Sequence, residues 1–212
     1  EMCIRDRYLG PVIFLESDLT AKAEIGICTG LAWTSVGGEL LKVEVLATNG
    51  KGGLVLTGQL GDVMKESAQA GISYIRSVED QYKIDPEFFQ KHDMHVHIPE
   101  GAVPKDGPSA GITMATAMLS AIIEKPVRAD LAMTGEITLR GRVLPIGGLK
   151  EKLLAAKKAG IHMVLVPEKN EPDVRELDAE ITDGLQIEFV GSMEQVLKHQ
   201  ADPVLPYPGL SV

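Results

Sequence analysis

Ser109 is a candidate nucleophile because of the loop that precedes it. Residues 101–111 read GAVPKDGPSAG, in which Pro104 and Pro108 restrict the backbone and Gly107 permits conformations closed to other residues. The apolar run that follows predicts a helix starting at the serine, where unpaired backbone N–H groups and the positive end of the helix dipole lie. Such donors suit the oxyanion that forms when a serine attacks a carbonyl. The plain alternative is that Ser109 only caps the helix.

A serine nucleophile needs a base, and Lys152 is the lysine whose position fits that role. On a helical wheel, the helix predicted over residues 149–159 has an apolar arc that contains Lys152 but excludes Lys150, Lys157 and Lys158. Burial and a place in the first helical turn both lower a lysine pKa from its ordinary value of about 10.4. The alternative is that Lys152 lies at the edge of the arc and extends its ammonium group to water.

A serine esterase is a second hypothesis, because GPSAG also matches the GxSxG pattern of the hydrolase nucleophile elbow. That mechanism requires a downstream Asp or Glu and then a histidine, and His162 and His199 follow in the chain. The elbow also requires a strand directly before the serine, and Pro104 and Pro108 occupy that place, where proline is poorly tolerated. Mutation of the two histidines separates this mechanism from one based on lysine.

A metal site is a further alternative, raised by the pair His95 and His97. Side chains alternate along a strand, so both imidazoles lie on one face. Two histidines on a strand suit zinc and His92 is near, but a third ligand at suitable spacing is missing. The two cysteines, Cys3 and Cys28, form no ligand motif either. We therefore expect no metal, and favour polar lining of a groove or edge for the histidines.

The elements that position these residues predict an α/β (α+β) fold with mixed sheets flanked by helices. Strands cluster early in the chain and alternate with helices later. Gly37 and Gly38 predict a turn, residues 54–60 are expected to return as a hairpin strand, and Asp62 is expected to cap the next helix. The predicted strands are residues 25–34, 40–47, 54–60, 94–98, 133–139, 142–146, 163–166 and 185–190, and the predicted helices are residues 63–81, 109–123, 149–159, 172–181 and 192–199.

Composition narrows the classes of partner. The chain has 212 residues and a formal net charge of -9, which argues against nucleic acid or an anionic membrane as the main partner. This charge and the lack of a basic aromatic face also speak against a third hypothesis, a non-catalytic RNA-binding module. No apolar run approaches the roughly 18 residues of a membrane span. The cysteine usage suits a reducing, intracellular location.

Two long motifs carry a resemblance to a known family. Residues 99–111, PEGAVPKDGPSAG, and residues 133–160, MTGEITLRGRVLPIGGLKEKLLAAKKAG, resemble the proteolytic domain of bacterial LonA-type Lon proteases. Residues 30–38 and 58–69 are similar to upstream parts of that domain. The expected organisation is an unmatched segment at residues 1–8, the proteolytic domain at residues 9–200, and a proline-rich tail at residues 201–212.

The resemblance implies a Ser–Lys dyad that hydrolyses peptide bonds. Ser109 matches the family's nucleophile, and Lys152, the second lysine of KEK, matches its base. Thr134 of MTGE is expected to hydrogen-bond the lysine amine, and Asp106 matches a loop residue linked to active and inactive states in relatives. Three further residues match polar positions near the family's site: Glu44, His95 and His97.

The resemblance also implies partners. The family's domain normally follows an ATPase module that unfolds protein substrates, assembles as a six-fold ring and works in the cytoplasm. This sequence has no GxxxxGK[ST] phosphate-binding loop, so ATP and magnesium are expected only on an ATPase module absent from this chain, with no cofactor in the chain itself. We therefore expect a homo-hexamer that acts on unfolded protein or peptide, without contacts to nucleic acid or membrane.

Overall fold

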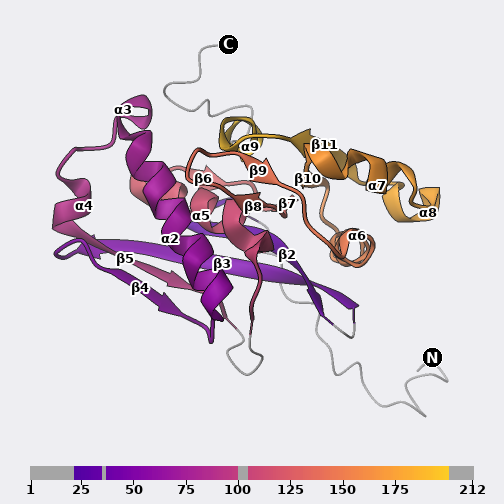
Figure 1. The fold of residues 1–212 in the computed structure, drawn as a ribbon, viewed down its shortest axis with the longest axis horizontal. Helices are drawn as coiled ribbons and strands as arrows, with labels where there is room; N and C mark the ends of the chain where they lie inside the picture. The colour runs from indigo at the N-terminus through magenta and orange to yellow at the C-terminus, as the bar shows by residue number, and fades with distance from the viewer. Residues whose placement is uncertain (1–21, 35–36, 100–104, 201–212) are drawn as a thin grey trace.

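The computed structural model describes residues 22–34, 37–99 and 105–200, which are arranged around a seven-stranded mixed sheet (Figure 1). The order of strands in this sheet is β11-β10-β7-β2-β3-β5-β4. The strands are β1 (Glu24–Ile25), β2 (Ile27–Thr34), β3 (Gly37–Asn49), β4 (Leu54–Thr57), β5 (His92–His97), β6 (Pro126–Val127), β7 (Leu131–Met133), β8 (Glu136–Ile137), β9 (Val143–Leu144), β10 (Met163–Pro167) and β11 (Gln186–Val190). The helices are α2 (Asp62–Ser77), α3 (Glu79–Tyr82), α4 (Phe88–Lys91), η1 (Pro108–Ala110), α5 (Gly111–Ile123), α6 (Leu149–Lys158), η2 (Glu168–Asn170), α7 (Glu171–Arg175), α8 (Ala179–Thr182) and α9 (Met193–Gln200). The mixed sheet with flanking helices confirms the expected fold class.

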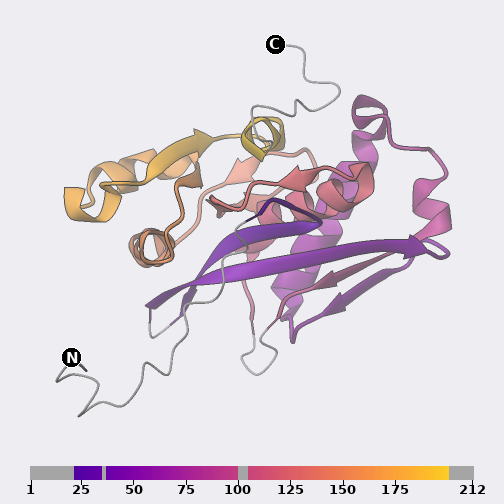
Figure 2. The ribbon, with the colours of Figure 1, turned by 180° about the vertical axis from the view of Figure 1, so that it is seen from behind.

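Helices cover the sheet on both faces because its strands bury alternate side chains on opposite sides. On one face α5 packs against β2 and β3, and α2 packs on α5 (Figure 1). On the other face α6 packs against β2 and β3 (Figure 2). Leu31 of β2 and Leu153 of α6 belong to the core cluster on that face. Most of helix α5 lies in the core, with all its residues from Gly111 to Ser120 buried. The sheet therefore carries α5 and α6, the two helices that the candidate site needs, on opposite faces.

The pairing of β4 differs from the sequence prediction. The run at residues 54–60 forms a strand only at Leu54–Thr57, and it pairs in parallel with β5 instead of returning as a hairpin on β3. Strand β5 occupies the edge of β3, antiparallel to it. The helices α2 to α4 between β4 and β5 supply the long connection that parallel pairing requires. Gly37 and Gly38 also differ from their predicted turn, because they begin β3 and pair with Thr34 and Trp33.

The predicted cap of α2 is also wrong. Asp62 is the first helical residue, and the cap position is Gly61, which has no side chain to offer. The capping carboxylate comes from the nucleophile loop instead, since the backbone N–H of Met64 donates to Oδ1 of Asp106 over 3.1 Å. The helix predicted over residues 63–81 is divided into α2 and α3 at Val78. No helix in the described ranges is long and apolar enough to cross a membrane.

Candidate active site

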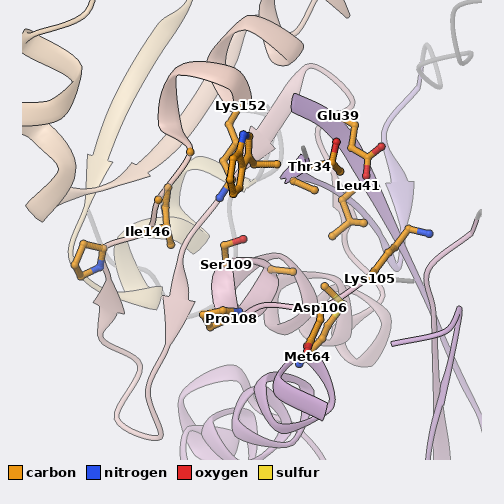
Figure 3. Close-up of a pocket in the computed structure, with 16 residues that line it drawn as sticks. Thr34, Glu39, Leu41, Met64, Lys105, Asp106, Pro108, Ser109, Ile146 and Lys152 are labelled. Atoms are coloured by element: carbon orange, nitrogen blue, oxygen red, sulfur yellow. Dashed lines mark hydrogen bonds between the residues drawn. The ribbon is translucent and has the colours of Figure 1, made fainter. Parts of the chain in front are cut away.

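A pocket of about 570 Å³ brings Ser109 and Lys152 together (Figure 3). Its walls come from the ends of β2 and β3, the start of α2, the turn before α5, and the connection that leads into α6. The lining residues are Ala32, Trp33, Thr34, Glu39, Leu41, Met64, Lys105, Asp106, Pro108, Ser109, Ala110, Pro145, Ile146, Gly147, Gly148 and Lys152. Trp33 lines this pocket and is 58% exposed.

Ser109 lies in the 3-10 turn η1, immediately before α5. Gly107 precedes the turn with a φ of 125°, a conformation that favours glycine. The Ser109 carbonyl accepts a hydrogen bond of 2.8 Å from the N–H of Gly135, which anchors the turn to the segment after β7. Gly111 must be small, because a Cβ there would lie 2.9 Å from the backbone nitrogen of Ile137. Backbone contacts to residues distant in the sequence therefore fix the place of Ser109.

The predicted row of free amides at the helix start is partly occupied. The N–H of Gly111 donates to the Pro108 carbonyl, and the N–H of Ile112 donates to the Gly135 carbonyl over 3.1 Å. The reason is that the helix begins with a 3-10 turn and packs on the segment after β7, so these donors find partners within the protein. Neither amide is open to an incoming carbonyl in this arrangement.

Lys152 is buried, with 2% of its surface exposed, so the alternative in which it extends to water is wrong. Lys150 and Lys158 on the same helix are exposed, as the wheel predicted. Burial lowers the pKa of the Lys152 amine from 10.5 to about 8, because water no longer solvates the charged form. A large share of the amine is thereby available as a neutral base near pH 8.

Thr134 contacts the lysine as the resemblance implied. The Lys152 amine donates to Thr134 Oγ1 over 3.1 Å, and this hydroxyl donates in turn to the Ser109 carbonyl over 3.4 Å. Thr134 is fully buried directly after β7. One hydroxyl therefore connects the Lys152 amine to the backbone of Ser109.

The start of α6 is held against the hairpin of β2 and β3 by two close contacts. A Cβ on Gly38 would lie 2.0 Å from the Glu151 carbonyl oxygen, so strand and helix backbones touch there. Gly148 has a φ of +68°, and a Cβ on it would lie 2.8 Å from Trp33 Cβ. These contacts fix the first turn of α6, from which Lys152 projects.

Ser109 and Lys152 face the same cavity from different elements (Figure 3). Within the described ranges, no hydrogen bond joins Ser109 Oγ to Lys152 Nζ, and the amine is held by Thr134 instead. The pocket therefore holds the Lys152 amine in a fixed orientation, and the Ser109 hydroxyl is not bonded to it.

The other predicted site residues divide into two groups. Asp106 lines the pocket and also accepts the N–H of Gly107 over 2.8 Å. Glu44, His95 and His97 lie on β3 and β5 and do not line the pocket. The Thr57 hydroxyl, which the sequence did not single out, contacts His95 Nε2 at 2.9 Å and His97 Nδ1 at 2.7 Å. The two imidazoles of β5 therefore share the Thr57 hydroxyl, away from the pocket.

Several pocket residues carried no signal in the sequence. Glu39 and Leu41 line the pocket from β3, and neither belongs to a recognisable motif. Met64 lines it from α2 and lies within the matched residues 58–69, but nothing in that stretch marked it as a site residue. They reach the site because β3 passes beside the nucleophile turn and because Asp106 fastens the start of α2 to the nucleophile loop. Such positions follow from tertiary packing and leave no local pattern.

A serine and a buried lysine in one pocket, with a hydroxyl that orients the amine, form the constellation of a Ser–Lys hydrolase. Comparison with known families gives a match of residues 4–202 to the Lon protease (S16) C-terminal proteolytic domain. The chain belongs to this family, which confirms the resemblance seen in its motifs.

Individual Lon proteases are similar to this chain over nearly its whole length. The chain is 67% identical to the Lon protease of Lachnoclostridium phytofermentans over 192 residues, which cover 91% of this chain and 24% of that protein. It is 56% identical to the Lon protease of Clostridioides difficile over 193 residues, 91% of this chain and 24% of that protein. The match to the Lon protease of Geobacter metallireducens is 54% identical over 205 residues, 97% of this chain and 25% of that protein. The chain spans about a quarter of the length of these relatives.

Proposed function

We propose that this chain is a serine endopeptidase and the peptide-hydrolysing part of an ATP-dependent protease. Ser109 is the nucleophile and Lys152 its general base. The observation that carries this proposal is the burial of the Lys152 amine in the pocket that Ser109 lines, where its pKa falls to about 8. A lysine that is neutral in part near physiological pH is what activation of a serine requires.

Catalysis begins when the Ser109 hydroxyl turns to the lone pair of the neutral Lys152 amine. The amine takes the proton as Oγ attacks the scissile carbonyl, and the resulting ammonium gives a proton to the leaving amine. Water then attacks the acyl-enzyme ester by the same route and releases the second product. Thr134 holds the amine in place during both transfers through its 3.1 Å hydrogen bond.

The oxyanion needs donors near Ser109. Because the amides of Gly111 and Ile112 are occupied, the Ser109 amide is our candidate donor. Further donors become available when the turn Pro108–Ala110 opens. We therefore propose that movement of this turn, with Asp106 beside it, converts the site from a resting to a competent state. An isolated domain is accordingly expected to cleave peptides or unfolded protein weakly and stable folded protein not at all.

Substrate and assembly follow from the pocket and the relatives. We expect the peptide substrate to bind as an extended chain. We assign unfolding to an ATPase module of the full-length protein, since the chain spans about a quarter of its relatives and has no phosphate-binding loop. A cytoplasmic homo-hexamer without a cofactor of its own is the assembly that we propose for this domain, with protein as its only macromolecular substrate.

Active-site variants test the chemistry. Ser109→Ala and Lys152→Ala should each abolish cleavage of a fluorogenic peptide or casein, with far-UV circular dichroism unchanged. His162→Ala and His199→Ala serve as matched controls, because neither histidine lines the pocket and the esterase mechanism requires one of them. Full activity in either dyad variant contradicts the proposal, and loss in a histidine variant favours the esterase.

A further inference from the structure

The connection between β9 and α6 forms one wall of the pocket. Four successive residues, Pro145, Ile146, Gly147 and Gly148, all line it. Proline has no backbone N–H, and the two glycines have the most backbone freedom of any residue. This wall lies outside any strand or helix, and α6 begins directly after it at Leu149. Its shape therefore depends on what holds Ile146.

The side chain of Asn170 holds both backbone groups of Ile146. The Ile146 N–H donates to Asn170 Oδ1 over 2.9 Å, and Asn170 Nδ2 donates to the Ile146 carbonyl over 3.0 Å. The carboxamide thus pairs with this residue as a neighbouring strand would. Asn170 is 3% exposed, at the end of the short helix η2 that follows β10. A core strand of the sheet therefore supports the pocket wall through one side chain.

No other side chain of similar size makes the same set of bonds. The second N–H of the Asn170 amide donates to Asp173 Oδ2 over 2.6 Å, so both donors are used. An aspartate at this position keeps an acceptor for Ile146 but loses both donors, and it would face the carboxylate of Asp173. A leucine fills the volume and leaves the Ile146 N–H and carbonyl without partners.

We propose that Asn170 is a positioning residue of the active site, whose carboxamide fixes the pocket wall at Ile146 and, through that wall, the start of α6 that presents Lys152. The link to the helix is direct, because the Lys152 backbone N–H donates to the Gly148 carbonyl over 3.1 Å. Gly148 is two residues from Ile146, within the same connection. This inference rests on the proposed function, since it concerns how the substrate and the base are placed.

Loss of this clamp should have two effects. The wall moves, so peptide substrate binds less well, and KM rises about fivefold or more, as expected for lost buried hydrogen bonds. Water also gains access to the Lys152 amine, so its pKa rises toward the ordinary lysine value. The charged groups that line the pocket, Glu39, Lys105 and Asp106, are the same in all variants described below.

The test compares Asn170→Ala with Asp173→Ala. The control variant removes the carboxylate that contacts Asn170 but keeps both bonds to Ile146. KM for a fluorogenic peptide and the pKa of Lys152 are measured for each protein, the latter by NMR titration of ¹³C-labelled lysine with the signal assigned from Lys152→Met. We expect a raised KM and a raised Lys152 pKa in Asn170→Ala, and wild-type values of both in Asp173→Ala. Neither quantity depends on the fraction of protein that is folded.

A swapped pair covers the case in which Asn170→Ala does not fold. Asn170→Asp combined with Asp173→Asn keeps the net charge, the volumes and a contact between the two residues, and removes the donor to the Ile146 carbonyl. KM and the pKa should rise in this variant as well. Wild-type values in folded Asn170→Ala or in the swapped pair overturn the proposal, as do equal changes in Asp173→Ala. Absence of cleavage by the wild type would refute the proposed function alone, because the NMR titration still decides the role of Asn170.

Discussion

Peptide cleavage by this domain should depend on the protonation of a single lysine with a pKa close to 8. Burial of Lys152 lowers its pKa from 10.5 to about 8. At pH 7 an amine with a pKa of 8 is neutral in about one molecule in ten, whereas at 10.5 the fraction is about one in 3,000. The lowered pKa therefore raises the population of neutral, active base by roughly 300-fold at neutral pH.

The assay is the dependence of kcat/KM on pH between 6 and 10 with a fluorogenic peptide. The value should rise about tenfold per pH unit below pH 8 and level off above it, because only the neutral amine accepts the Ser109 proton. The sign follows from the lysine: raising the pH deprotonates the base and increases activity. Circular dichroism across the same range controls for unfolding.

Lys152→Arg provides the matched control. It retains a cation on the same helix, but a guanidinium stays protonated throughout this range, so the variant should be inactive at every pH. Two results refute the reasoning. A midpoint near 6.5 in the wild type points to a histidine base, and recovery of Lys152→Arg at high pH shows that the base lies elsewhere.

Three further predictions concern residues that hold the site. Lys152→Met should raise the free energy of unfolding by up to about 3 kcal/mol below pH 8. This gain should fade as the pH approaches 10.5, because the amine of the wild type is then neutral in both the folded and the unfolded state. Urea titrations at pH 7 and pH 10 measure the difference. Thr134→Val should lower kcat roughly tenfold with KM unchanged, because the amine loses its orienting hydroxyl; steady-state kinetics check this, and an unchanged kcat contradicts it. Gly38→Ala should cost about 1–3 kcal/mol, because its methyl group meets the Glu151 carbonyl oxygen; a melting temperature equal to the wild type contradicts this.

Much of the fold could be predicted because burial leaves periodic patterns in the sequence. The alternation in β3 and the helical spacing in α2 follow directly from one-sided burial. Strand pairing leaves no such pattern, since β4 could close a hairpin on β3 or pair across a helical connection with β5. The second arrangement occurs because β5 takes the edge of β3 and places β4 outside it. The predicted hairpin was wrong because of this choice of partner, although a strand does begin at Leu54 as predicted.

The site residues divide in the same way, into those that local sequence patterns could predict and those that are placed by contacts with distant residues. The apolar arc of α6 separated Lys152 from its neighbouring lysines, and burial confirms that position, whereas its role as the base stays a prediction. Asp106 was identified only as part of a loop motif, whereas its bond to Met64 joins residues 42 positions apart. Asn170 gave no signal at all, because it recognises the backbone of Ile146 and so does not depend on the side chain there. Contacts between a side chain and a distant backbone are invisible to patterns of residue type.

The hydrogen bonds of Thr134 explain how one arrangement serves both protonation states of the base. The hydroxyl has one hydrogen, which it donates to the Ser109 carbonyl, so it can only accept from the Lys152 amine. A neutral amine that donates one N–H to Thr134 still has its lone pair to receive the Ser109 proton. After that transfer the ammonium keeps the same bond and has further N–H groups to protonate the leaving amine. In the proposed mechanism the lysine therefore alternates between base and acid and keeps its hydrogen bond to Thr134 throughout. Loss of the threonine hydroxyl should accordingly affect kcat more than substrate binding.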